Sequence, residues 1–447
     1  MTGKVVILGA GAVGMTVATY LKRHTKHEVT VFSSDNNTAY SQCGLPFVLE
    51  GVVHDFSDLV IRPPDTFVDM GIDLHLGTTV NHIDTGCQKV ISDAGVFEYD
   101  YLVIATGSMP FVPPLKGREL DGVFTLHTLS DGIAIDRSMK DSSSVVIIGA
   151  GGIGAEVAGS LALRGIAVTL VEAIPQVLPL TLDPDMALLV QQHLTSLGVN
   201  VRTGVQVDSI NGLNHVQSVS VGKELVPADV VIVATGLRPL SGIARDAGFD
   251  IGPAGGIVTN EHLRVSLAGE FQDNVYAGGE CAEVIDFITD SPFISRLGSA
   301  ARRMARVIGE NITEQDAVYP PTLSPNVVVV GNLVAGSVGI TSQRAKDSDM
   351  SIVYGISEGL TRAGYYPGGS QLNVKLIFAG LQLVGAQVVA GEGVKERIDA
   401  LSLAIRMGAT VHDLLEWETS YSPPVSMVID PVTFAAADAK TKMEKMA

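Results

Sequence analysis

The chain of 447 residues has few cysteines and few aromatic side chains: three cysteines, one tryptophan and 5% aromatic residues in all. The cysteines stand far apart, at positions 43, 87 and 281, so they cannot build a disulfide framework. Their odd number is typical of a reducing compartment, and a cytoplasmic location is expected. Positive charge is scarce too. The chain has 30 Lys and Arg against 48 Asp and Glu, and its net charge of −18 disfavours binding to nucleic acid.

Long apolar runs are also missing. The longest stretch without a charged residue, 317–343, contains three prolines and three glycines. A membrane-spanning helix needs about 20 mostly apolar residues, so two sheet strands are expected there instead. The amino terminus leads directly into a strand and shows no signal peptide, and no membrane partner is expected. The length suits about three domains.

The first glycine-rich unit is VVILGAGAVG, which is followed by a predicted helix over about residues 12–23 and by the strand HEVTVF. Gly9 permits a tight turn, Gly11 lets the backbone approach a pyrophosphate, and Gly14 lets the helix pack close to the strand. Free N–H groups at the start of such a helix favour phosphate. The order strand, glycines, helix and strand predicts a dinucleotide site.

A second unit, VVIIGAGGIG, repeats the pattern with Gly149, Gly151 and Gly154. The strand AVTLVE that follows ends in Glu172, about 20 residues after the glycines. A carboxylate there is placed to accept hydrogen bonds from a ribose diol, and it repels a 2′-phosphate. This unit therefore predicts an exchangeable nicotinamide dinucleotide, with NADH favoured over NADPH.

Each unit is followed by an apolar strand that ends in Ala-Thr-Gly, at 101–110 (YLVIATGSMP) and 230–239 (VVIVATGLRP). The chain thus holds two copies of one architecture. The fold class predicted is α/β, with two Rossmann-like dinucleotide-binding domains. Two nucleotide sites at this spacing indicate one tightly bound flavin and one exchangeable nicotinamide.

With these motifs the sequence resembles the flavin-dependent pyridine nucleotide–disulfide oxidoreductases, and within them the single-cysteine branch. That branch contains coenzyme A-disulfide reductases, NADH oxidases and peroxidases, and persulfide reductases. Three further segments carry the resemblance: NVYAGGECAEV at 274–284, the stretch 383–405, and ETSYSPPVSMVIDP at 418–431. The resemblance implies a homodimer whose chain forms a discontinuous FAD domain (1–111 and 251–324), an inserted NAD(P) domain (112–250) and an α+β dimerisation domain (325–447). The segment from about residue 441 is expected to be a mobile tail.

The resemblance also implies the cofactor residues, and no metal site is expected. FAD would be held by Gly9, Gly11, Gly14, Ser33, Asp35, Ala105, Thr106, Gly107, Gly279 and Glu280. The nicotinamide dinucleotide would be held by Gly149, Gly151, Gly154, Glu156, Glu172 and Gly236. The chain departs from the family pattern at three of its positions. Ser33 stands where an acid is expected, with Asp35 as a substitute. Glu280 replaces the usual Asp, and Gly152 replaces a tyrosine that covers the flavin.

Cys43 lies in AYSQCGLPFVLEG, where a helix can begin directly after the thiol because Pro46 is tolerated in a first turn. The dipole and free N–H groups of that helix favour a thiolate, whereas the alternative is an inert buried cysteine. No second cysteine stands nearby, so Cys43 would cycle through a mixed disulfide or a sulfenic acid. In family terms it would lie beside the flavin ring. Cys87 and Cys281 are taken as structural.

Two features favour a small disulfide or persulfide as the substrate, with coenzyme A disulfide as one candidate. The first helix lacks the histidine that oxidase members place beside the cysteine, and Gln42 stands where the reductases commonly have Asn. Tyr421 would reach across the dimer to donate a hydrogen bond to the departing sulfur. Two alternatives stay open: an NADH oxidase or peroxidase that uses a Cys43 sulfenic acid, and a flavoprotein sensor or electron carrier without thiol chemistry.

Overall fold

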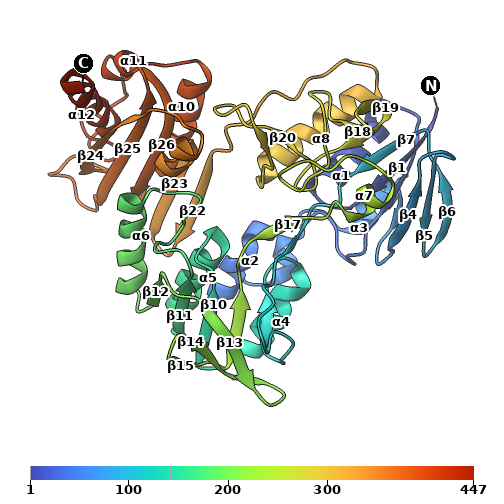
Figure 1. Cartoon of the computed structure of the whole chain (residues 1–447), viewed down its shortest axis with the longest axis horizontal. Coiled ribbons are helices and arrows are strands. Elements are labelled where there is room, and N and C mark those ends of the chain that lie inside the picture. Colours follow the sequence, from blue (N-terminus) through green and yellow to red (C-terminus); the bar gives the residue numbers. More distant parts are fainter. Residues whose placement is uncertain (1, 141, 447) are drawn as a thin grey trace. The chain divides into compact units, whose positions relative to one another are not determined.

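The computed structural model describes residues 2–140 and 142–446. The chain divides into two compact units, whose helices and strands are labelled in Figure 1. Unit 1 comprises the chain up to Leu45, His54–Pro110 and Leu237–Ser324. Unit 2 comprises Pro46–Val53, Phe111–Gly236 and the chain from Pro325 onward. Each glycine-rich unit of the sequence therefore falls in a different unit of the structure.

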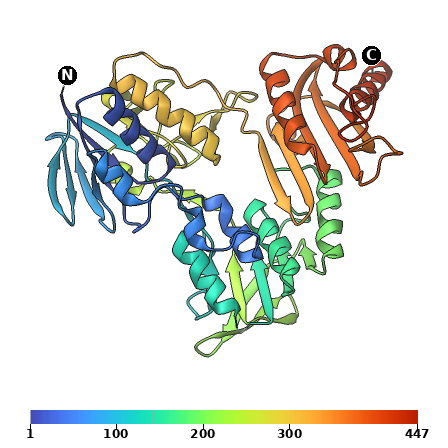
Figure 2. The same ribbon diagram turned by 180° about the vertical axis from the view of Figure 1, so that it is seen from behind.

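Unit 1 is built on a six-stranded sheet in the order β18-β19-β7-β1-β2-β3, in which only β18 and β19 pair antiparallel. The bounds are β1 (Lys4–Leu8), β2 (Glu28–Phe32), β3 (Asp73–His75), β7 (Tyr101–Ile104), β18 (Arg264–Leu267) and β19 (Glu270–Ala277). Helices α1 (Ala12–His24) and α8 (Gly298–Ile312) lie side by side, and both contribute to one apolar core with β1 and β2 (Figure 2). The central strands are covered on both faces, which explains their uninterrupted apolar sequence.

A three-stranded antiparallel sheet, β4-β5-β6, belongs to the same unit, and Phe97 of β6 meets Phe32 edge to face at 4.9 Å. Its strands are β4 (Val80–Asp84), β5 (Lys89–Ser92) and β6 (Gly95–Glu98). The smaller elements of unit 1 are η1 (Gln42–Gly44), η2 (Phe56–Leu59), α3 (Pro64–Asp69), β8 (Ser108–Pro110), β17 (Leu237–Pro239), α7 (Gly242–Asp246), β20 (Val284–Ile285) and β21 (Pro292–Phe293).

Unit 2 contains a five-stranded parallel sheet in the order β12-β11-β10-β16-β9. Its strands are β9 (Val123–Thr125), β10 (Ser144–Ile148), β11 (Ala167–Glu172), β12 (Asn200–Thr203) and β16 (Val230–Val233). The helices are α2 (Leu45–Glu50), which begins at the last residue of unit 1, then α4 (Leu129–Met139), α5 (Gly152–Leu163) and α6 (Pro184–Ser196). The antiparallel strands β13 (Val207–Gly212), β14 (Val216–Val221) and β15 (Glu224–Pro227) share a core with β10 and β16.

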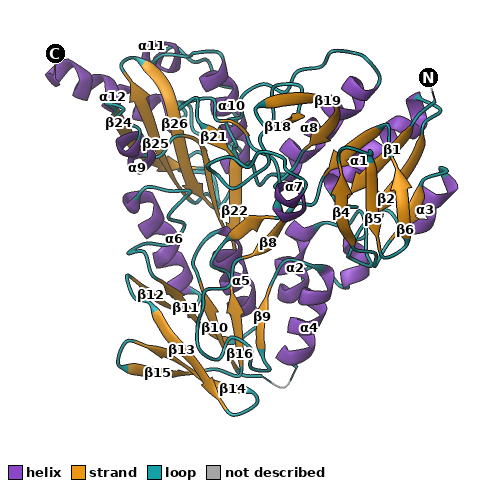
Figure 3. Cartoon of the chain, turned by 45° about the vertical axis from the view of Figure 1, so that its right-hand side comes forward, coloured by secondary structure: helices purple, strands orange, loops and turns teal. Residues whose placement is uncertain are grey.

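The rest of unit 2 is an antiparallel sheet in the order β22-β23-β26-β25-β24, with helices beside it (Figure 3). The strands are β22 (Asn326–Val330), β23 (Leu333–Gly339), β24 (Val353–Leu360), β25 (Gln371–Ala379) and β26 (Gln382–Ala390). The helices are α9 (Ser342–Asp347), α10 (Val394–Arg406), α11 (Val411–Leu415) and α12 (Pro431–Met446). The two strands expected within 317–343 are confirmed as β22 and β23.

The mobile tail expected from about residue 441 is wrong, because α12 continues to Met446. Lys442 fastens this part of the helix to the sheet: its ammonium donates to the Tyr354 carbonyl at 3.1 Å and to Asp438 at 2.7 Å. Within the part of the chain that the structure describes, every helix is too short or too polar to cross a bilayer.

Candidate functional site

The first glycine turn joins β1 to α1 in unit 1, and its three glycines have different reasons to lack a side chain. Gly9 has φ of +112°, and a Cβ there would overlap the Ala105 carbonyl. A Cβ on Gly14 would overlap the Gly9 carbonyl. A Cβ on Gly11 would meet nothing within 4 Å, so the space over this residue is open to a ligand. No side chain caps α1, whose first N–H groups are left for an anion.

The second glycine turn, between β10 and α5 in unit 2, repeats this geometry. Gly149 has φ of +104°, a Cβ on Gly154 would overlap the Gly149 carbonyl, and Gly151 faces open space. Glu172, at the end of β11, accepts from the backbone N–H of Ala150 at 2.8 Å. It also accepts from the N–H of Ile174 at 2.9 Å. The carboxylate is thus held at the edge of the glycine turn.

The loop after β2 contains Ser33 and Asp35. The Ser33 hydroxyl accepts from the N–H of Asp35 at 3.2 Å. The Asp35 carboxylate accepts from the N–H of Asn37 at 2.9 Å and from the hydroxyl of Tyr40 at 2.9 Å. Within unit 1 this loop follows the strand next to the first glycine turn, since β2 pairs with β1. Both side chains are therefore fixed by hydrogen bonds in a loop one strand away from the first glycine turn.

The two Ala-Thr-Gly segments directly follow β7 and β16. Ala105 donates its N–H to the Leu8 carbonyl at 2.8 Å, and the Thr106 hydroxyl donates to the Leu240 carbonyl at 2.6 Å. Gly107 and Gly236 have φ of +71° and +111°, where the chain turns away from each strand. The first segment thus lies against the first glycine turn.

Gly279 and Glu280 follow β19 in unit 1. Gly279 has φ of +84°. The Glu280 carboxylate accepts a hydrogen bond from the hydroxyl of Ser108, which is buried in β8. The longer side chain that replaces the usual Asp is therefore held by a specific partner. The next residue, Cys281, is fully buried, which raises the pKa of its thiol, and it suits a structural role.

Glu156 is the fifth residue of α5, two residues after Gly154. Burial raises the pKa of its carboxyl group to about 7, although a hydrogen bond from the N–H of Val329, at 3.1 Å, opposes this shift. Val329 belongs to β22, so Glu156 joins the second glycine unit to the antiparallel sheet within unit 2. A group that titrates near neutrality beside a nucleotide turn is a candidate functional residue.

Cys43 lies in the short helix η1 of unit 1, immediately before α2 begins at Leu45. Its side chain is exposed, as is that of Gln42, and no disulfide occurs among the three cysteines, all of which lie in the described ranges. The N–H of Gly44 donates to the Ser41 carbonyl at 3.1 Å, and a Cβ on Gly44 would overlap the Leu59 side chain. The local fold therefore presents the thiol at the surface of unit 1.

Tyr421 belongs to unit 2, whereas Cys43 belongs to unit 1, and each residue is described within its own unit. The Tyr421 hydroxyl lies 3.2 Å from the hydroxyl of Tyr365. This hydrogen bond raises the pKa of Tyr421, and a phenol is protonated at neutral pH even at its ordinary pKa. The side chain is 42% exposed and therefore accessible from outside the chain.

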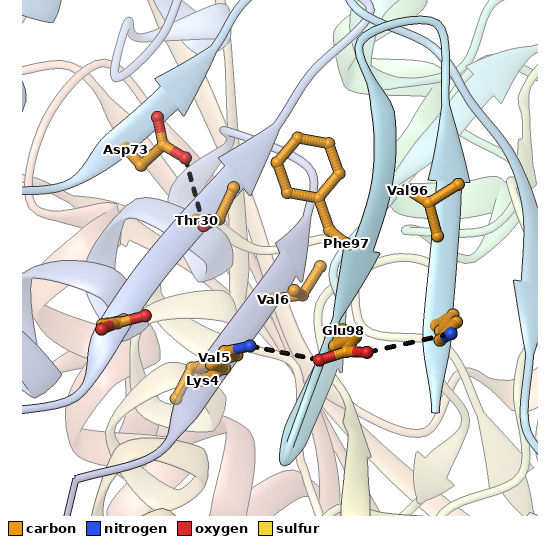
Figure 4. Close-up of a pocket in the computed structure, with 10 residues that line it drawn as sticks. Lys4, Val5, Val6, Thr30, Asp73, Val96, Phe97 and Glu98 are labelled. Atoms are coloured by element: carbon orange, nitrogen blue, oxygen red, sulfur yellow. Dashed lines mark hydrogen bonds and ion pairs between the residues drawn. The ribbon is translucent and has the colours of Figure 1, made fainter. Parts of the chain in front are cut away.

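Unit 1 also contains a cavity of about 530 Å³, which Figure 4 shows in close-up. It is lined by Lys4, Glu28 and Asp73, the first residues of β1, β2 and β3, and by Phe97 and Glu98 of β6. Dinucleotides bind at the carboxyl ends of parallel strands, and this cavity is at the amino ends. It is therefore not the dinucleotide site, despite its size.

Some residues of the site escaped the sequence analysis. Thr38, whose buried hydroxyl donates to the Ala10 carbonyl at 2.7 Å, ties the loop after β2 to the first glycine turn. The partners of Asp35 and Glu280, Tyr40 and Ser108, were also missed. No motif marks them, because each contact depends on a loop conformation or on a partner far away in the sequence.

The two glycine turns, each with its parallel sheet and its Ala-Thr-Gly strand, define an oxidoreductase with two dinucleotide sites. The chain belongs to the pyridine nucleotide-disulphide oxidoreductase family, whose model matches residues 3–305, and the dimerisation-domain model of the same family matches residues 325–431. The predicted family and α/β fold class are thereby confirmed. The family is enzymatic and uses FAD.

The chain is 41% identical to a protein of Methanocaldococcus jannaschii named NADH oxidase, over 98% of this chain and 99% of that protein. It is 34% identical to the NAD(P)H sulfur oxidoreductase (CoA-dependent) of Pyrococcus furiosus, over 97% of this chain and 98% of that protein. Among solved structures, an NAD-dependent persulfide reductase from A. fulgidus matches with a TM-score of 0.94 and 34% identity. That match covers 99% of this chain and 84% of the other.

Proposed function

We propose that the chain is an FAD-dependent NAD(P)H:disulfide oxidoreductase that reduces a small disulfide or persulfide, coenzyme A disulfide above all, through Cys43. The observation that carries the proposal is the exposed Cys43 thiol on η1, in the unit that also holds the first glycine turn. The relative from Pyrococcus furiosus is named as a CoA-dependent sulfur oxidoreductase, and that from A. fulgidus as a persulfide reductase, which supports the substrate class.

The residues present fit the two cofactors. The open space over Gly11 and the uncapped start of α1 suit the pyrophosphate of FAD, and Gly151 and Glu172 suit NADH in the same way. When bound, FAD supplies a relay for two electrons from the nicotinamide to sulfur. We assign residues 1–111 and 251–324 to an FAD domain, 112–250 to an NAD domain and 325–447 to dimerisation. The further FAD contacts are Ser33, Asp35, Ala105, Thr106, Gly107, Gly279 and Glu280, and those to NADH are Gly149, Gly154, Glu156 and Gly236.

Cys43 performs the thiol chemistry. Its thiolate attacks one sulfur of the substrate R–S–S–R, which forms Cys43–S–S–R and releases one thiolate RS⁻. Reduction of this mixed disulfide by two electrons releases the second RS⁻ and restores the thiolate. The division of one reduction into two sulfur exchanges is covalent catalysis. Gln42, beside Cys43 and also exposed, is placed to donate an amide hydrogen bond to the bound substrate.

Tyr421 acts on the departing sulfur in a homodimer. Its hydroxyl lies 3.2 Å from that of Tyr365, and either of the two can donate. When Tyr365 donates to Tyr421, the Tyr421 proton is left for the sulfur, because a phenol keeps its proton at neutral pH. It donates a hydrogen bond to RS⁻ in the partner's site. The dimerisation-domain match over residues 325–431, which includes Tyr421, supports this arrangement.

A second function, NADH oxidase, is favoured by the 41% identity to the Methanocaldococcus jannaschii protein of that name. It requires Cys43 to pass through a sulfenic acid. On α1 the one histidine is His24, in the last turn, where its ring nitrogen binds the Tyr20 carbonyl at 2.8 Å. α1 thus offers no histidine near its start, which favours the disulfide reductase.

Mass spectrometry of the untreated protein tests whether the chain is a disulfide reductase or an NADH oxidase. An adduct of coenzyme A or another thiol on Cys43 is expected. An oxygen adduct on Cys43, together with rapid NADH consumption under air and without a disulfide, would decide for the oxidase. If Cys43 carries no adduct and stays unreactive during turnover, the thiol mechanism is wrong.

A further inference from the structure

We propose that the hydrogen bond between Asp35 and Tyr40, here called the loop clasp, holds the segment that carries Cys43 in place. Asp35 and Tyr40 are then positioning residues for the thiol. The inference rests on the proposed function of Cys43, and it adds two residues to the site that act through the backbone rather than on the substrate.

The loop clasp closes a short loop directly before the thiol. The Tyr40 hydroxyl donates to Oδ2 of Asp35 at 2.9 Å, while Oδ1 accepts from the N–H of Asn37 at 2.9 Å and from its amide nitrogen at 3.2 Å. A hydrogen bond to an ionised group is stronger than one between neutral groups. One carboxylate thus fixes both the middle and the end of the loop.

The backbone inside the loop needs such support. Ala39 has φ of +52°, in the left-handed region that residues other than glycine rarely adopt. Conformations of this kind persist where the surroundings hold them in place. Thr38 holds one side, through its buried hydrogen bond to the Ala10 carbonyl at 2.7 Å. Tyr40, with its hydroxyl on Asp35, holds the other.

The same segment also fixes the backbone on both sides of Cys43. The N–H of Ile61 donates to the Ala39 carbonyl at 2.9 Å, and the N–H of Ser41 donates to the Leu59 carbonyl at 2.9 Å. Gly44, directly after the thiol, packs on Leu59 so closely that no Cβ would fit. Cys43 therefore lies between two points that are fixed against the segment around Leu59.

The position of the carboxylate explains why this chain has the loop clasp. Ser33 stands where the family has an acid, and its hydroxyl accepts from the N–H of Asp35 at 3.2 Å. Asp35, two residues further along the loop, provides a carboxylate within reach of Tyr40. A carboxylate offers about four acceptor positions, of which the clasp and Asn37 use three, so Asp35 can still accept from a ribose hydroxyl. The Asp35 carboxylate would then both bind the ribose of the cofactor and hold the segment that carries the Cys43 thiol.

The experiment compares the flavin-loaded variants Tyr40→Phe, Asp35→Ala and their double mutant with wild type, all in a Cys87→Ser background so that one exposed thiol remains. The pH midpoint of Cys43 alkylation by iodoacetamide and the long-wavelength absorbance of thiolate against flavin are measured. Turnover with NADH and coenzyme A disulfide is also measured. For Tyr40→Phe we expect kcat to fall about three- to tenfold, with KM for NADH within about twofold.

We also expect the midpoint in Tyr40→Phe to rise and the long-wavelength band to weaken, and the two single substitutions to be non-additive. Asp35→Asn keeps an acceptor for the hydroxyl but removes the charge, and it is expected to lose less of the long-wavelength band than Asp35→Ala. Tyr20→Phe is the matched control, because it removes a hydroxyl that accepts from Gln315 at 3.2 Å elsewhere in unit 1.

An unchanged midpoint and band in Tyr40→Phe, additive effects, or equal losses in Asp35→Asn and Asp35→Ala would overturn the loop clasp. Failure of the proposed function has a different signature. In that case wild type itself reduces no disulfide. The pH midpoints of Cys43 alkylation in wild type and Tyr40→Phe can still be compared, and this comparison still tests the loop clasp.

Discussion

At the scale of single residues, the two exposed cysteines of unit 1 allow a direct test of the thiol mechanism. Cys43 lies on η1 before α2, whereas Cys87 lies in a turn between β4 and β5, where its N–H donates to Asp84 at 2.9 Å. Both are exposed, but only Cys43 stands in a segment that resembles a catalytic one.

Replacement of Cys43 by serine is expected to lower disulfide reduction about a thousandfold or more, because a hydroxyl cannot exchange with a disulfide. Reduction of the flavin by NADH, followed anaerobically by loss of flavin absorbance, is expected to continue. Cys87→Ser is the control and should keep full turnover. Full turnover in Cys43→Ser would instead favour a flavoprotein without thiol chemistry.

The glycines of the second turn provide a matched pair of substitutions. A Cβ on Gly154 would overlap the Gly149 carbonyl, so Gly154→Ala is expected to cost about 2–4 kcal/mol of stability. A Cβ on Gly151 meets nothing, so Gly151→Ala should keep its thermal midpoint but weaken NADH binding at least about tenfold, since the methyl group occupies the pyrophosphate space. Thermal unfolding and NADH titration measure the two effects. Equal midpoints for both variants would contradict this assignment.

At the scale of elements, the sequence predicted the helices and strands that arise from local residue patterns. The helix expected over about 12–23 is α1 (Ala12–His24), and the two strands within 317–343 are present. The contacts of the candidate site were not predictable in the same way. Glu156 bonds to Val329, which is 173 residues away, and Glu280 bonds to Ser108, which is 172 residues away. Such pairs arise from the topology of the sheets, which leaves no periodic signal. The tail prediction failed because it depended only on the position of the segment at the end of the chain, whereas Lys442 donates a hydrogen bond to the Tyr354 carbonyl of the adjacent sheet.

Glu156 links α5 to β22, and its buried carboxyl group makes this junction sensitive to pH. Its pKa rises from an ordinary value of 4.5 to about 7 in the fold. Between these values the unfolded chain has already released a proton that the folded chain retains. Folding stability is therefore favoured below pH 4.5 and is lost as pH rises through about 7, by up to about 3 kcal/mol.

Glu156→Gln keeps the shape and removes the ionisation. The thermal midpoints of wild type and Glu156→Gln, measured from pH 4.5 to 8 without nucleotide, are expected to coincide at the acid end. Above that, wild type should fall progressively below the variant until about pH 7, and the gap should then stay constant. Parallel curves over the whole range would mean that Glu156 ionises in the fold as it does in water.

At the scale of the whole molecule, a largely buried ion-pair cluster joins helix α6 to the antiparallel sheet of unit 2. Lys375 of β25 lies 2.9 Å from Asp183 and 2.8 Å from Asp185, at the start of α6. The side chains of Lys375 and Asp183 are 5% and 1% exposed. Asp183 also accepts from the N–H of Ser342 at 2.9 Å. The cluster therefore ties α6, which follows the second glycine turn in the chain, to the antiparallel sheet β22-β23-β26-β25-β24. Tyr421 comes after this sheet in the sequence.

Removal of the cation leaves a buried carboxylate without its counter-charge. Lys375→Ala is expected to destabilise the protein by about 3–5 kcal/mol, which is measured as a lower thermal midpoint. The exposed pair between Lys395 and Asp399 on α10 is the control, and Lys395→Ala should change the midpoint little. Equal effects of the two substitutions would show that the cluster contributes no more than a surface pair.

The proposed dimer can be tested by mixing two variants, because Cys43 and Tyr421 of a complete site would come from different chains. Cys43→Ser and Tyr421→Phe are each expected to be strongly impaired as pure proteins. If the two variants are unfolded, mixed in equal amounts and refolded with flavin, random pairing gives about half heterodimers. In each heterodimer one site has both substitutions and the other has neither, so about a quarter of the wild-type sites should be restored. Separate refolding of each variant is the control. If a site instead uses Cys43 and Tyr421 of the same chain, the mixture will show no gain over the average of the two pure variants.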